Sequence, residues 1–289
     1  METAGFILIQ LLNGVQYGLL LFLLSTGLTL VFGVMGIINL AHGSFYMLGA
    51  YAAHALAAWG LGFPAVLLLA LAGSVTAGLL TEVLTLRHVS PGDHLGQVLL
   101  TFGLILIFNE SMRLFFGPEI KTLAIPDYLD HTVRLFGPHH YPAYRLFATG
   151  FGLAAGAGLW VLINRTRLGM IIRAGAENRE MVEALGIGIR PLFSLVFALG
   201  AGLAAASGII AAPIVSIYPG MGEEIIILTF VVVVVGGLGS LKGALLASLL
   251  IGVADTFGKS LLPELSSVMA YALMALVLLL RPQGLFSRG

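Results

Sequence analysis

Long apolar runs follow one another through this chain, and the first lysine or arginine is Arg87. The first run, residues 6–33, is longer than the roughly 20 apolar residues that an α-helix needs to cross the hydrocarbon layer of a bilayer. A mean hydropathy of +1.02 and a charged fraction of 10% also lie outside the range of soluble domains. The sequence therefore predicts an all-α polytopic integral membrane protein, with residues 1–289 forming a single transmembrane domain.

Glycine- and proline-containing breaks separate the apolar runs from one another, as expected at turns and helix boundaries. We count nine candidate helices, and eight or ten are also compatible with the pattern, so we expect about eight to nine transmembrane helices. The predicted ranges are 6–33, 37–58, 64–86, 97–115, 144–163, 191–212, 224–240, 243–258 and 266–280.

The few charges predict which loops face the cytoplasm. Residues 164–190 hold five Arg and three Glu, and burying eight charges at about 3 kcal/mol each would cost roughly 24 kcal/mol. This segment must therefore be a loop outside the lipid, and the positive-inside rule makes it cytoplasmic, together with the tail 281–288. The segment 116–143 has only Lys121 and Arg134 as basic residues, so we expect it outside, with the N-terminus also outside.

The stretch INLAHGSFYMLGAY places polar side chains inside an apolar run. Its glycines weaken helical structure, which predicts a glycine-broken helix near residues 36–50. Irregular backbone at membrane depth must line a cavity or be enclosed by protein. We therefore treat Asn39, His42, Gly43 and Ser44 as candidates beside a translocation path. The alternative is that these side chains only cap helix ends and bond to neighbouring helices.

A second glycine-interrupted run, residues 230–244, follows at an offset of 200 residues. Paired interrupted segments in the two halves of a transporter often mark an internal repeat around a central path. This pattern adds Gly236, Gly237, Gly239 and Ser240 to the candidates for the path. A tight cytoplasmic turn between two closely packed helices explains the glycines equally well.

The arginine-rich loop contains a predicted short helix. Asn178 is a good N-cap, and Gly186 suits the position just after a helix. Such a helix, with an apolar face, can dock into a groove on a soluble partner or rest on lipid headgroups. The candidate coupling residues are Arg173, Glu177, Asn178, Glu180, Glu183, Leu185 and Gly186.

The remaining charges favour no chemistry of the chain's own. Glu82 lies close to Arg87 and Glu110 lies close to Arg113, so we expect local ion pairs, whereas Asp255 has no obvious partner. The pattern predicts no catalytic residues, no metal ligands, no cofactor and no ATP-binding loop, because no such motif occurs. The net charge of zero argues against nucleic acid as a partner.

Several separated motifs resemble one family in order and spacing. They are Asn13-Gly14, Tyr17-Gly18, Gly27-Leu28-Thr29, INLAHG, Met47–Tyr51, Arg165–Gly169, Arg173-Ala174, Glu177-Asn178, Leu185–Ile187, GGLGS with Gly243, and Arg281–Leu285. Together they cover nearly the whole chain, which resembles the LivH-type permease subunits of branched-chain amino acid ABC importers.

This resemblance implies a non-enzymatic permease in the bacterial inner membrane. Its implied partners are a LivM-like permease, two cytoplasmic ATP-binding subunits and a periplasmic substrate-binding protein, with lipid around the helices. By the same resemblance, residues 178–186 would sit on an ATPase, and INLAHG and GGLGS would lie beside the path. The alternatives are a urea or short-chain amide permease of the same family, or a self-sufficient channel or secondary carrier.

Overall fold

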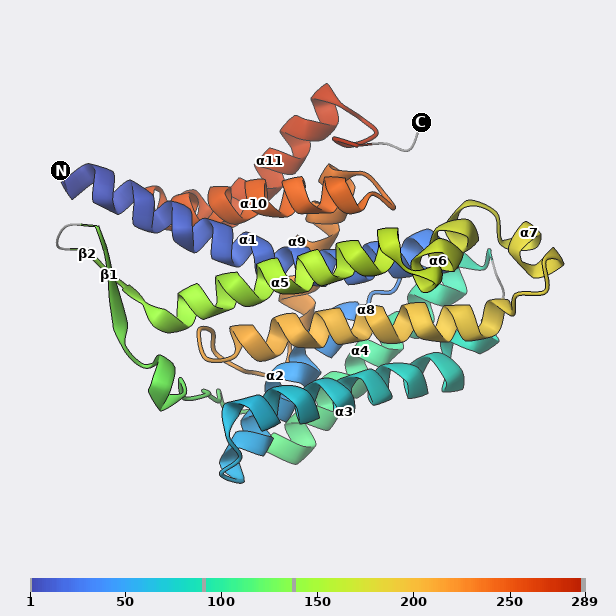
Figure 1. Ribbon diagram of the computed structural model, residues 1–289, viewed down its shortest axis with the longest axis horizontal. Coiled ribbons are helices and arrows are strands. Elements are labelled where there is room, and N and C mark those ends of the chain that lie inside the picture. The colour runs from blue at the N-terminus through green and yellow to red at the C-terminus, as the bar shows by residue number, and fades with distance from the viewer. Residues whose placement is uncertain (1, 90–91, 137–138, 287–289) are drawn as a thin grey trace.

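A computed structural model describes residues 2–89, 92–136 and 139–286. The elements are α1 (Glu2–Met35), α2 (His42–Ala58), α3 (Phe63–Leu84), η1 (Leu86–His88), α4 (His94–Phe116), η2 (Asp127–Leu129), β1 (Thr132–Phe136), β2 (His139–Pro142), α5 (Ala143–Arg165), α6 (Arg167–Glu177), α7 (Arg179–Ala184), α8 (Ile189–Ala211), α9 (Met221–Gly236), α10 (Leu241–Leu261), η3 (Pro263–Leu265) and α11 (Ser266–Leu280). Helices dominate, and the described strands form one two-stranded antiparallel sheet (Figure 1).

Each of the nine predicted apolar ranges corresponds to a helix, which confirms the all-α membrane class. In the described part of the chain, six helices are long and apolar enough to cross a membrane: α1, α3 continued by η1, α4, α5, α8 and α10. The other three apolar helices, α2, α9 and α11, have 17, 16 and 15 residues. At 1.5 Å per residue they span only about 23–26 Å, less than the roughly 30 Å of a hydrocarbon layer.

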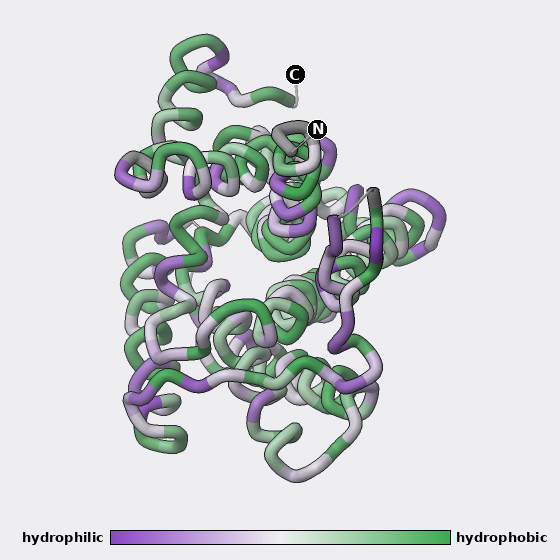
Figure 2. The backbone as a smooth tube through the Cα atoms, turned by 90° about the vertical axis from the view of Figure 1, so that its left-hand side faces the viewer, coloured by the Kyte–Doolittle hydropathy of each residue, from purple (hydrophilic) through white to green (hydrophobic). Residues whose placement is uncertain are grey.

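The long helices run between two ends of the molecule. One end, here called the hairpin end, holds β1 and β2 beside the start of α1; the other, the α7 end, holds α6 and α7 (Figure 1). Viewed from the hairpin end, the helices form a bundle in which apolar residues dominate (Figure 2). The described C-terminal segment belongs to the α7 end, because the backbone NH groups of Leu285 and Phe286 donate to the carbonyls of Val235 and Gly236. The start of α1 and the described end of the chain therefore lie at opposite ends.

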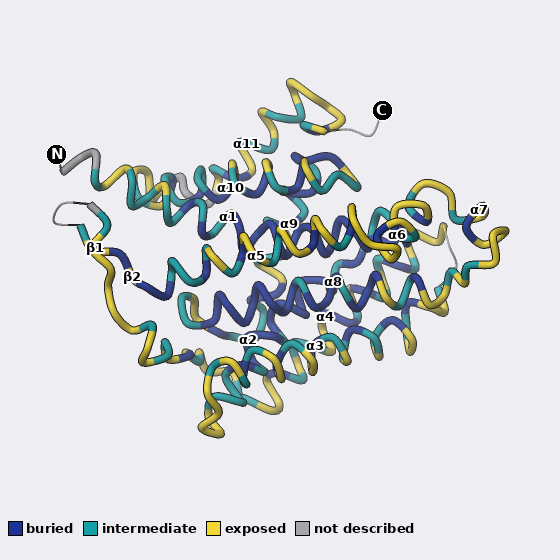
Figure 3. Tube along the Cα trace, viewed as in Figure 1, coloured by how far each residue is buried: buried dark blue, intermediate teal, exposed yellow. Residues whose placement is uncertain are grey.

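Helix α8 lies at the centre of the bundle and is buried for most of its length (Figure 3). It packs against α1, α2 and α3. Apart from Leu203, the stretch from Gly200 to Gly208 consists of small residues, which lets the neighbouring helix backbones come close. This part of α8 therefore packs against its neighbours by close backbone approach.

The contact between α1 and α10 follows the same rule. A Cβ atom added at Gly14 would lie 2.7 Å from the Cα of Val253, and one added at Gly18 would lie 2.9 Å from the Cα of Leu249. Both distances are too short for a side chain, so these glycines set the separation of the two helices. Helices α1 and α10 also form two walls of one cavity.

Two predicted boundaries need correction. The segment from residue 37 is not helical until His42, because Gly36 has a φ of 66° and turns the chain away from the axis of α1. The loop 164–190 contains two helices rather than one, since α6 precedes the predicted α7 and is capped by Thr166, whose hydroxyl accepts from the Gly169 NH at 3.1 Å. Residues 116–143 also contain the hairpin in addition to loop.

Candidate functional site

The first predicted motif forms a break between α1 and α2. Residues 36–41 run back along α1, and His42 opens α2 with its Nε2 atom 3.0 Å from the carbonyl oxygen of Leu24. Leu24 precedes Met35 by eleven positions, so His42 lies about 16 Å inside the bundle from the α7 end. Helix α2 therefore starts within the bundle and ends at the hairpin end, where the Nδ1 atom of His54 lies 3.0 Å from the carbonyl oxygen of Thr122. The predicted broken helix is present at this depth.

The polar residues of this break are enclosed rather than exposed to a cavity. Asn39 is 0% exposed, and among the described residues neither atom of its amide has a hydrogen-bond partner. A Cβ atom added at Gly43 would overlap the carbonyl oxygen of Gly222, at the start of α9. Ser44 is also buried. The three-residue spacing of Asn39 and His42 would place them on one face of a continuous helix, but Asn39 lies outside α2, so they do not share a face.

The second glycine run forms a turn at the α7 end. Gly237 and Gly239 have φ values of 96° and 80°, and the hydroxyl of Ser240 accepts from the Gly243 NH at 3.1 Å as the N-cap of α10. Gly236 and Gly243 meet backbone to backbone across this turn. A Cβ atom added at Gly33 would lie 3.8 Å from the Cα of Gly239. The structure thus places the second run beside α1, one turn before the break.

A cavity of about 450 Å³ lies in the half of the bundle nearer the hairpin end. Helix α1 contributes one continuous wall, with Gln10, Asn13, Gln16 and Tyr17 toward the hairpin end and Leu20, Leu21 and Leu24 toward the middle. Other walls come from α10, the start of α5, the end of α8 and the segment after it, α9, and Tyr46 of α2. The cavity therefore changes from polar to apolar along α1.

The break adjoins the apolar end of this cavity, on the side toward the α7 end. Leu24 lines the cavity, and its carbonyl oxygen contacts His42. Tyr46, one helical turn after His42, lines the cavity itself. The sequence motif and the cavity are therefore neighbouring parts of one region, although Asn39, His42, Gly43 and Ser44 do not line the cavity.

Among the described residues, three charged side chains line the cavity. Asp255 forms an ion pair with Lys259 at 2.6 Å, which corrects the prediction that Asp255 lacks a partner. The ammonium of Lys259 also lies 5.5 Å from the centre of the Tyr17 ring. Arg145 donates to the amide oxygen of Asn13 at 2.9 Å. These charges come from α5 and α10 and meet the polar part of α1.

Tyr141, in the hairpin, joins the same polar group. Its hydroxyl donates to the Asn13 amide oxygen at 3.0 Å. Burial raises the pKa of Tyr141, while the Arg145 guanidinium acts in the opposite direction. The phenol therefore stays a donor at neutral pH, and both donors hold the Asn13 amide in one orientation.

Sequence reasoning missed this cavity, but α1 carried a signal. Gln10, Asn13 and Tyr17 recur at intervals of three and four positions, so they share one face of a helix that is otherwise apolar. A polar stripe of this kind within a membrane helix indicates an aqueous or protein-facing side.

At the α7 end, the predicted short helix is present. The Asn178 side chain accepts from the backbone NH of Met181 at 2.9 Å, and Gly186 has a φ of 81° just after α7. Met181 and Leu185 are 58% and 72% exposed, whereas Val182 is buried. Of the other predicted coupling residues, Glu177, Glu180 and Glu183 are exposed, and Arg173 donates to the carbonyl of Ile163 at the end of α5.

Helix α7 also contacts the break. The guanidinium of Arg179 lies 5.8 Å from the centre of the Phe193 ring of α8 and packs against Gly36. Met35 and Ile37 border a small cavity together with Arg179. The exposed segment and the end of α1 are therefore in direct contact.

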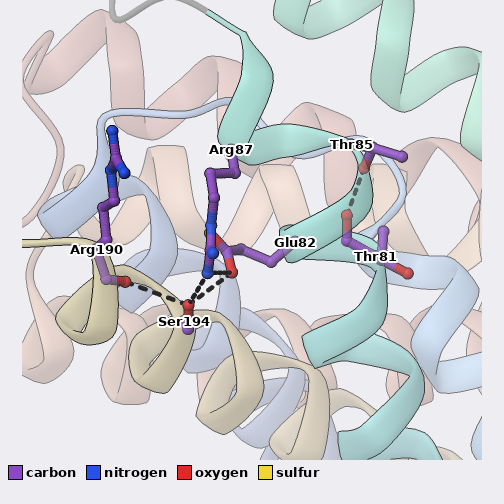
Figure 4. Close-up of polar contacts among 6 residues, drawn as sticks. All are labelled: Thr81, Glu82, Thr85, Arg87, Arg190 and Ser194. Atoms are coloured by element: carbon purple, nitrogen blue, oxygen red, sulfur yellow. Dashed lines mark hydrogen bonds and ion pairs between the residues drawn. The ribbon is translucent and has the colours of Figure 1, made fainter.

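A buried ion pair, drawn in Figure 4, borders the same small cavity as Met35, Ile37 and Arg179. Glu82, with a side chain only 2% exposed, pairs with Arg87 at 3.0 Å, as the sequence predicted. The hydroxyl of Ser194 donates to the same carboxylate at 2.7 Å, which ties α3 to α8. Within the described residues, no group of three or more His, Cys, Asp or Glu side chains gathers to hold a metal.

Comparisons with known proteins agree on one family. Residues 10–278 match the family model described as branched-chain amino acid transport system, permease component. The chain is 34% identical to the high-affinity branched-chain amino acid transport system permease protein BraD of Pseudomonas aeruginosa, covering 96% of this chain and 95% of that one. It is 28% identical to LivH of Escherichia coli, covering 99% and 97%, and 30% identical to LivM of the same species, covering 91% and 67%.

One solved structure shares the fold. PsaBC from Streptococcus pneumoniae, in complex with a Fab, superposes with a TM-score of 0.51 at 10% identity and covers 94% of this chain and 91% of that one. Because the sequence identity is low, this likeness concerns the fold alone. The family model covers nearly the whole of the chain. This protein belongs to the family of permease components of branched-chain amino acid transport systems.

Proposed function

We propose that this chain is the LivH-type permease subunit of an ATP-driven importer for branched-chain amino acids in the bacterial inner membrane. The relatives BraD and LivH are named as permeases of high-affinity branched-chain amino acid systems. A LivM-like permease, two cytoplasmic ATPases and a periplasmic binding protein complete the assembly. The permease has no catalytic role, and ATP hydrolysis by the separate subunits supplies the energy.

The observation that carries this proposal is that α1 connects the cavity to the exposed α7 segment. Between Gln10 and Leu24 it lines the cavity, and at Met35 it meets the break that contacts Arg179. A force applied at α7 therefore has a short, packed route to the cavity wall. A permease powered by external subunits needs such a route, since packed helices move as units.

The same arrangement gives each end a proposed side. The α7 end, with the arginine-rich segment 164–190, faces the cytoplasm and receives the ATPases through the candidate coupling residues Arg173 to Gly186. The hairpin end, with residues 116–143 and the start of α1, faces the periplasm. The break at Asn39–Ser44 and the turn at Gly236–Ser240 flank the path as switching elements that stay clear of substrate.

The apolar part of the cavity favours an aliphatic substrate over urea or a short-chain amide. Leu20, Leu21 and Leu24 offer no hydrogen-bond donors or acceptors from their side chains, whereas urea is polar on every edge. A self-sufficient proton- or sodium-coupled carrier is less well supported, because the buried carboxylates of Glu82 and Asp255 both have basic partners.

The test is uptake of radiolabelled leucine into proteoliposomes that contain both permeases and both ATPases, with binding protein added outside and ATP inside. We expect uptake only when ATP and binding protein are both present. A complex with hydrolysis-deficient ATPases is the matched control. Uptake that persists without ATP or ATPases would establish a channel or carrier instead, and uptake of urea but not of leucine would establish the other substrate class.

A further inference from the structure

The charges of the cavity do not balance. Among the described residues that line it, Asp255 and Lys259 neutralise each other at 2.6 Å. Arg145 contacts the neutral amide oxygen of Asn13 at 2.9 Å and forms no ion pair within the described part of the chain. The cavity therefore carries one cation in excess.

An unneutralised guanidinium on a cavity wall between helices favours an anionic ligand. A guanidinium has five NH donors in a planar fork, and one amide oxygen uses only a part of them. The fork matches the two oxygens of a carboxylate, and such pairs are stronger than hydrogen bonds between neutral groups. Arg145 is thus chemically suited to a carboxylate inside the cavity.

A second charged group suits the opposite end of an amino acid. Lys259 contacts one oxygen of Asp255, the Oδ2 atom, and a carboxylate offers about four acceptor positions on its two oxygens. The Lys259 side chain is 62% exposed, so its ammonium can move away from Asp255 and remain hydrated. Asp255 can then accept from a second ammonium group that enters the cavity.

The apolar part of the cavity completes the match. On α1, Leu20, Leu21 and Leu24 follow Asn13 and Tyr17 along the same wall, and Ile225 of α9 also contributes. A volume of about 450 Å³ falls in the range of small-molecule sites, which combine an apolar lining with a few placed polar groups. A cation, an anion and an aliphatic wall in one cavity correspond to the three parts of an aliphatic amino acid.

We propose that this cavity binds the transported amino acid as a zwitterion, with the α-carboxylate at Arg145, the α-ammonium at Asp255 and the aliphatic side chain along Leu20, Leu21 and Leu24. This proposal rests on the proposed function, and it gives the permease a substrate site of its own. Recognition is then repeated inside the membrane after the binding protein has delivered its ligand.

The test is equilibrium binding of radiolabelled leucine to the permease–ATPase complex in lipid nanodiscs, without binding protein. Competition uses leucinamide, which lacks the carboxylate, and 4-methylpentanoate, which lacks the ammonium group. We expect leucine to bind and both competitors to be at least about tenfold weaker, as for the loss of one charged hydrogen-bonded contact.

Variants then assign each charge. Arg145→Gln should weaken leucine binding about tenfold or more and remove the preference for leucine over leucinamide, while Arg145→Lys should restore part of it. Asp255→Asn should weaken leucine but not 4-methylpentanoate. The control is Arg113→Gln, which removes the same charge from the same end of the molecule, where Arg113 is exposed and pairs with Glu110 at 3.6 Å.

Wild-type affinity for leucine in Arg145→Gln would overturn the site, as would equal competition by leucine and leucinamide, or no binding of leucine at millimolar concentration. Uptake by the complete transporter separates the two proposals. If ATP-dependent leucine uptake occurs but leucine does not bind to the cavity, the proposed binding site is refuted and the proposed function is not. If no branched-chain amino acid is taken up in an ATP-dependent way, the proposed function is refuted.

Discussion

Polar side chains occur in both halves of this bundle, but their surroundings differ. In the half nearer the hairpin end, Gln10, Asn13 and Asp255 border a cavity of about 450 Å³. In the half nearer the α7 end, Asn39 and His42 are enclosed by packed helices, and Glu82 is buried beside Arg87 at the edge of a small cavity. A polar residue in this bundle therefore either borders a cavity or is enclosed by packed helices, and only the space around it distinguishes the two.

The largest effect is expected where enclosed packing allows no side chain at all. Gly43→Val would push a side chain into the carbonyl of Gly222, and neither backbone can rotate out of the way. Overpacking commonly costs about 1–3 kcal/mol, and a backbone-to-backbone contact should reach the upper end or exceed it. We expect a loss of folded protein, measured by size-exclusion chromatography in detergent and by thermal unfolding.

Gly73→Val is the matched control for this substitution. Gly73 lies in α3, and a Cβ atom added there would meet nothing within 4 Å. The same three carbon atoms should therefore be tolerated, with a stability change of less than about 1 kcal/mol. Equal stability of the two variants would show that α2 and α9 are not packed through Gly43.

The next prediction compares the loss of stability when one acidic residue from each half is replaced by its amide. Glu82→Gln leaves Arg87 without its partner and weakens the contact with Ser194. Breaking a buried pair costs about 3–5 kcal/mol, but Arg87 is about one-third exposed, so we expect about 2 kcal/mol. Asp255→Asn should cost less than about 1 kcal/mol, because Lys259 is largely exposed.

Thermal unfolding of both variants in the same detergent checks this difference. A cost for Asp255→Asn equal to or above that of Glu82→Gln would contradict the contrast between an enclosed half and a cavity-lined half. Glu110→Gln serves as a surface reference, since Glu110 and Arg113 are both exposed.

The positions of the helices could be predicted because each apolar run has its own length and its own breaks. The break itself was placed at the right motif, but its extent was not, because Ile37 and Leu40 continue the apolar pattern and only the φ of Gly36 ends the helix. The N-cap at Asn178 could be predicted since capping depends on residues close in sequence.

The cavity could not be predicted, because it depends on helices distant in sequence. Gln10 and Asn13 lie within a run whose overall hydropathy hides them, and Arg145 reaches Asn13 from a position more than a hundred residues later. The partner of Asp255 was missed for a simpler reason. The predicted helix ended at residue 258, whereas α10 continues to Leu261 and brings Lys259 onto the same face, four positions on.

A smaller effect of opposite sign is expected at Asn39. Its amide is fully buried without a partner in the described structure, and an unsatisfied polar group costs about 1–3 kcal/mol. Asn39→Leu keeps the number and branching of the side-chain heavy atoms and removes both unpaired polar atoms, so it should raise the stability by about 1 kcal/mol, measured as a higher unfolding temperature. Asn39→Asp should lower it, because it adds a buried charge.

The unpaired amide of Asn39 is free to find a partner in another state of the transporter. We therefore expect Asn39→Leu to combine higher stability with slower ATP-dependent uptake. Lower stability of Asn39→Leu would instead mean that the amide is already paired in the resting fold. Asn39 would then have no role in switching.

The smallest effect on the fold is expected at the tip of the α7 end. Leu185 is 72% exposed, so Leu185→Asp should change the stability by less than about 0.5 kcal/mol. If α7 docks on an ATPase, the same substitution buries a charge in that interface, and co-purification of the ATPases should be lost while the permease stays inserted. Glu183→Arg should act similarly by reversing a charge on α7.

Met170→Asp on α6 is the control, because Met170 is also exposed and precedes the predicted docking helix. Normal co-purification and normal uptake in both α7 variants would refute the coupling role, and equal loss in the α6 control would move that role from α7 to the whole segment 164–190.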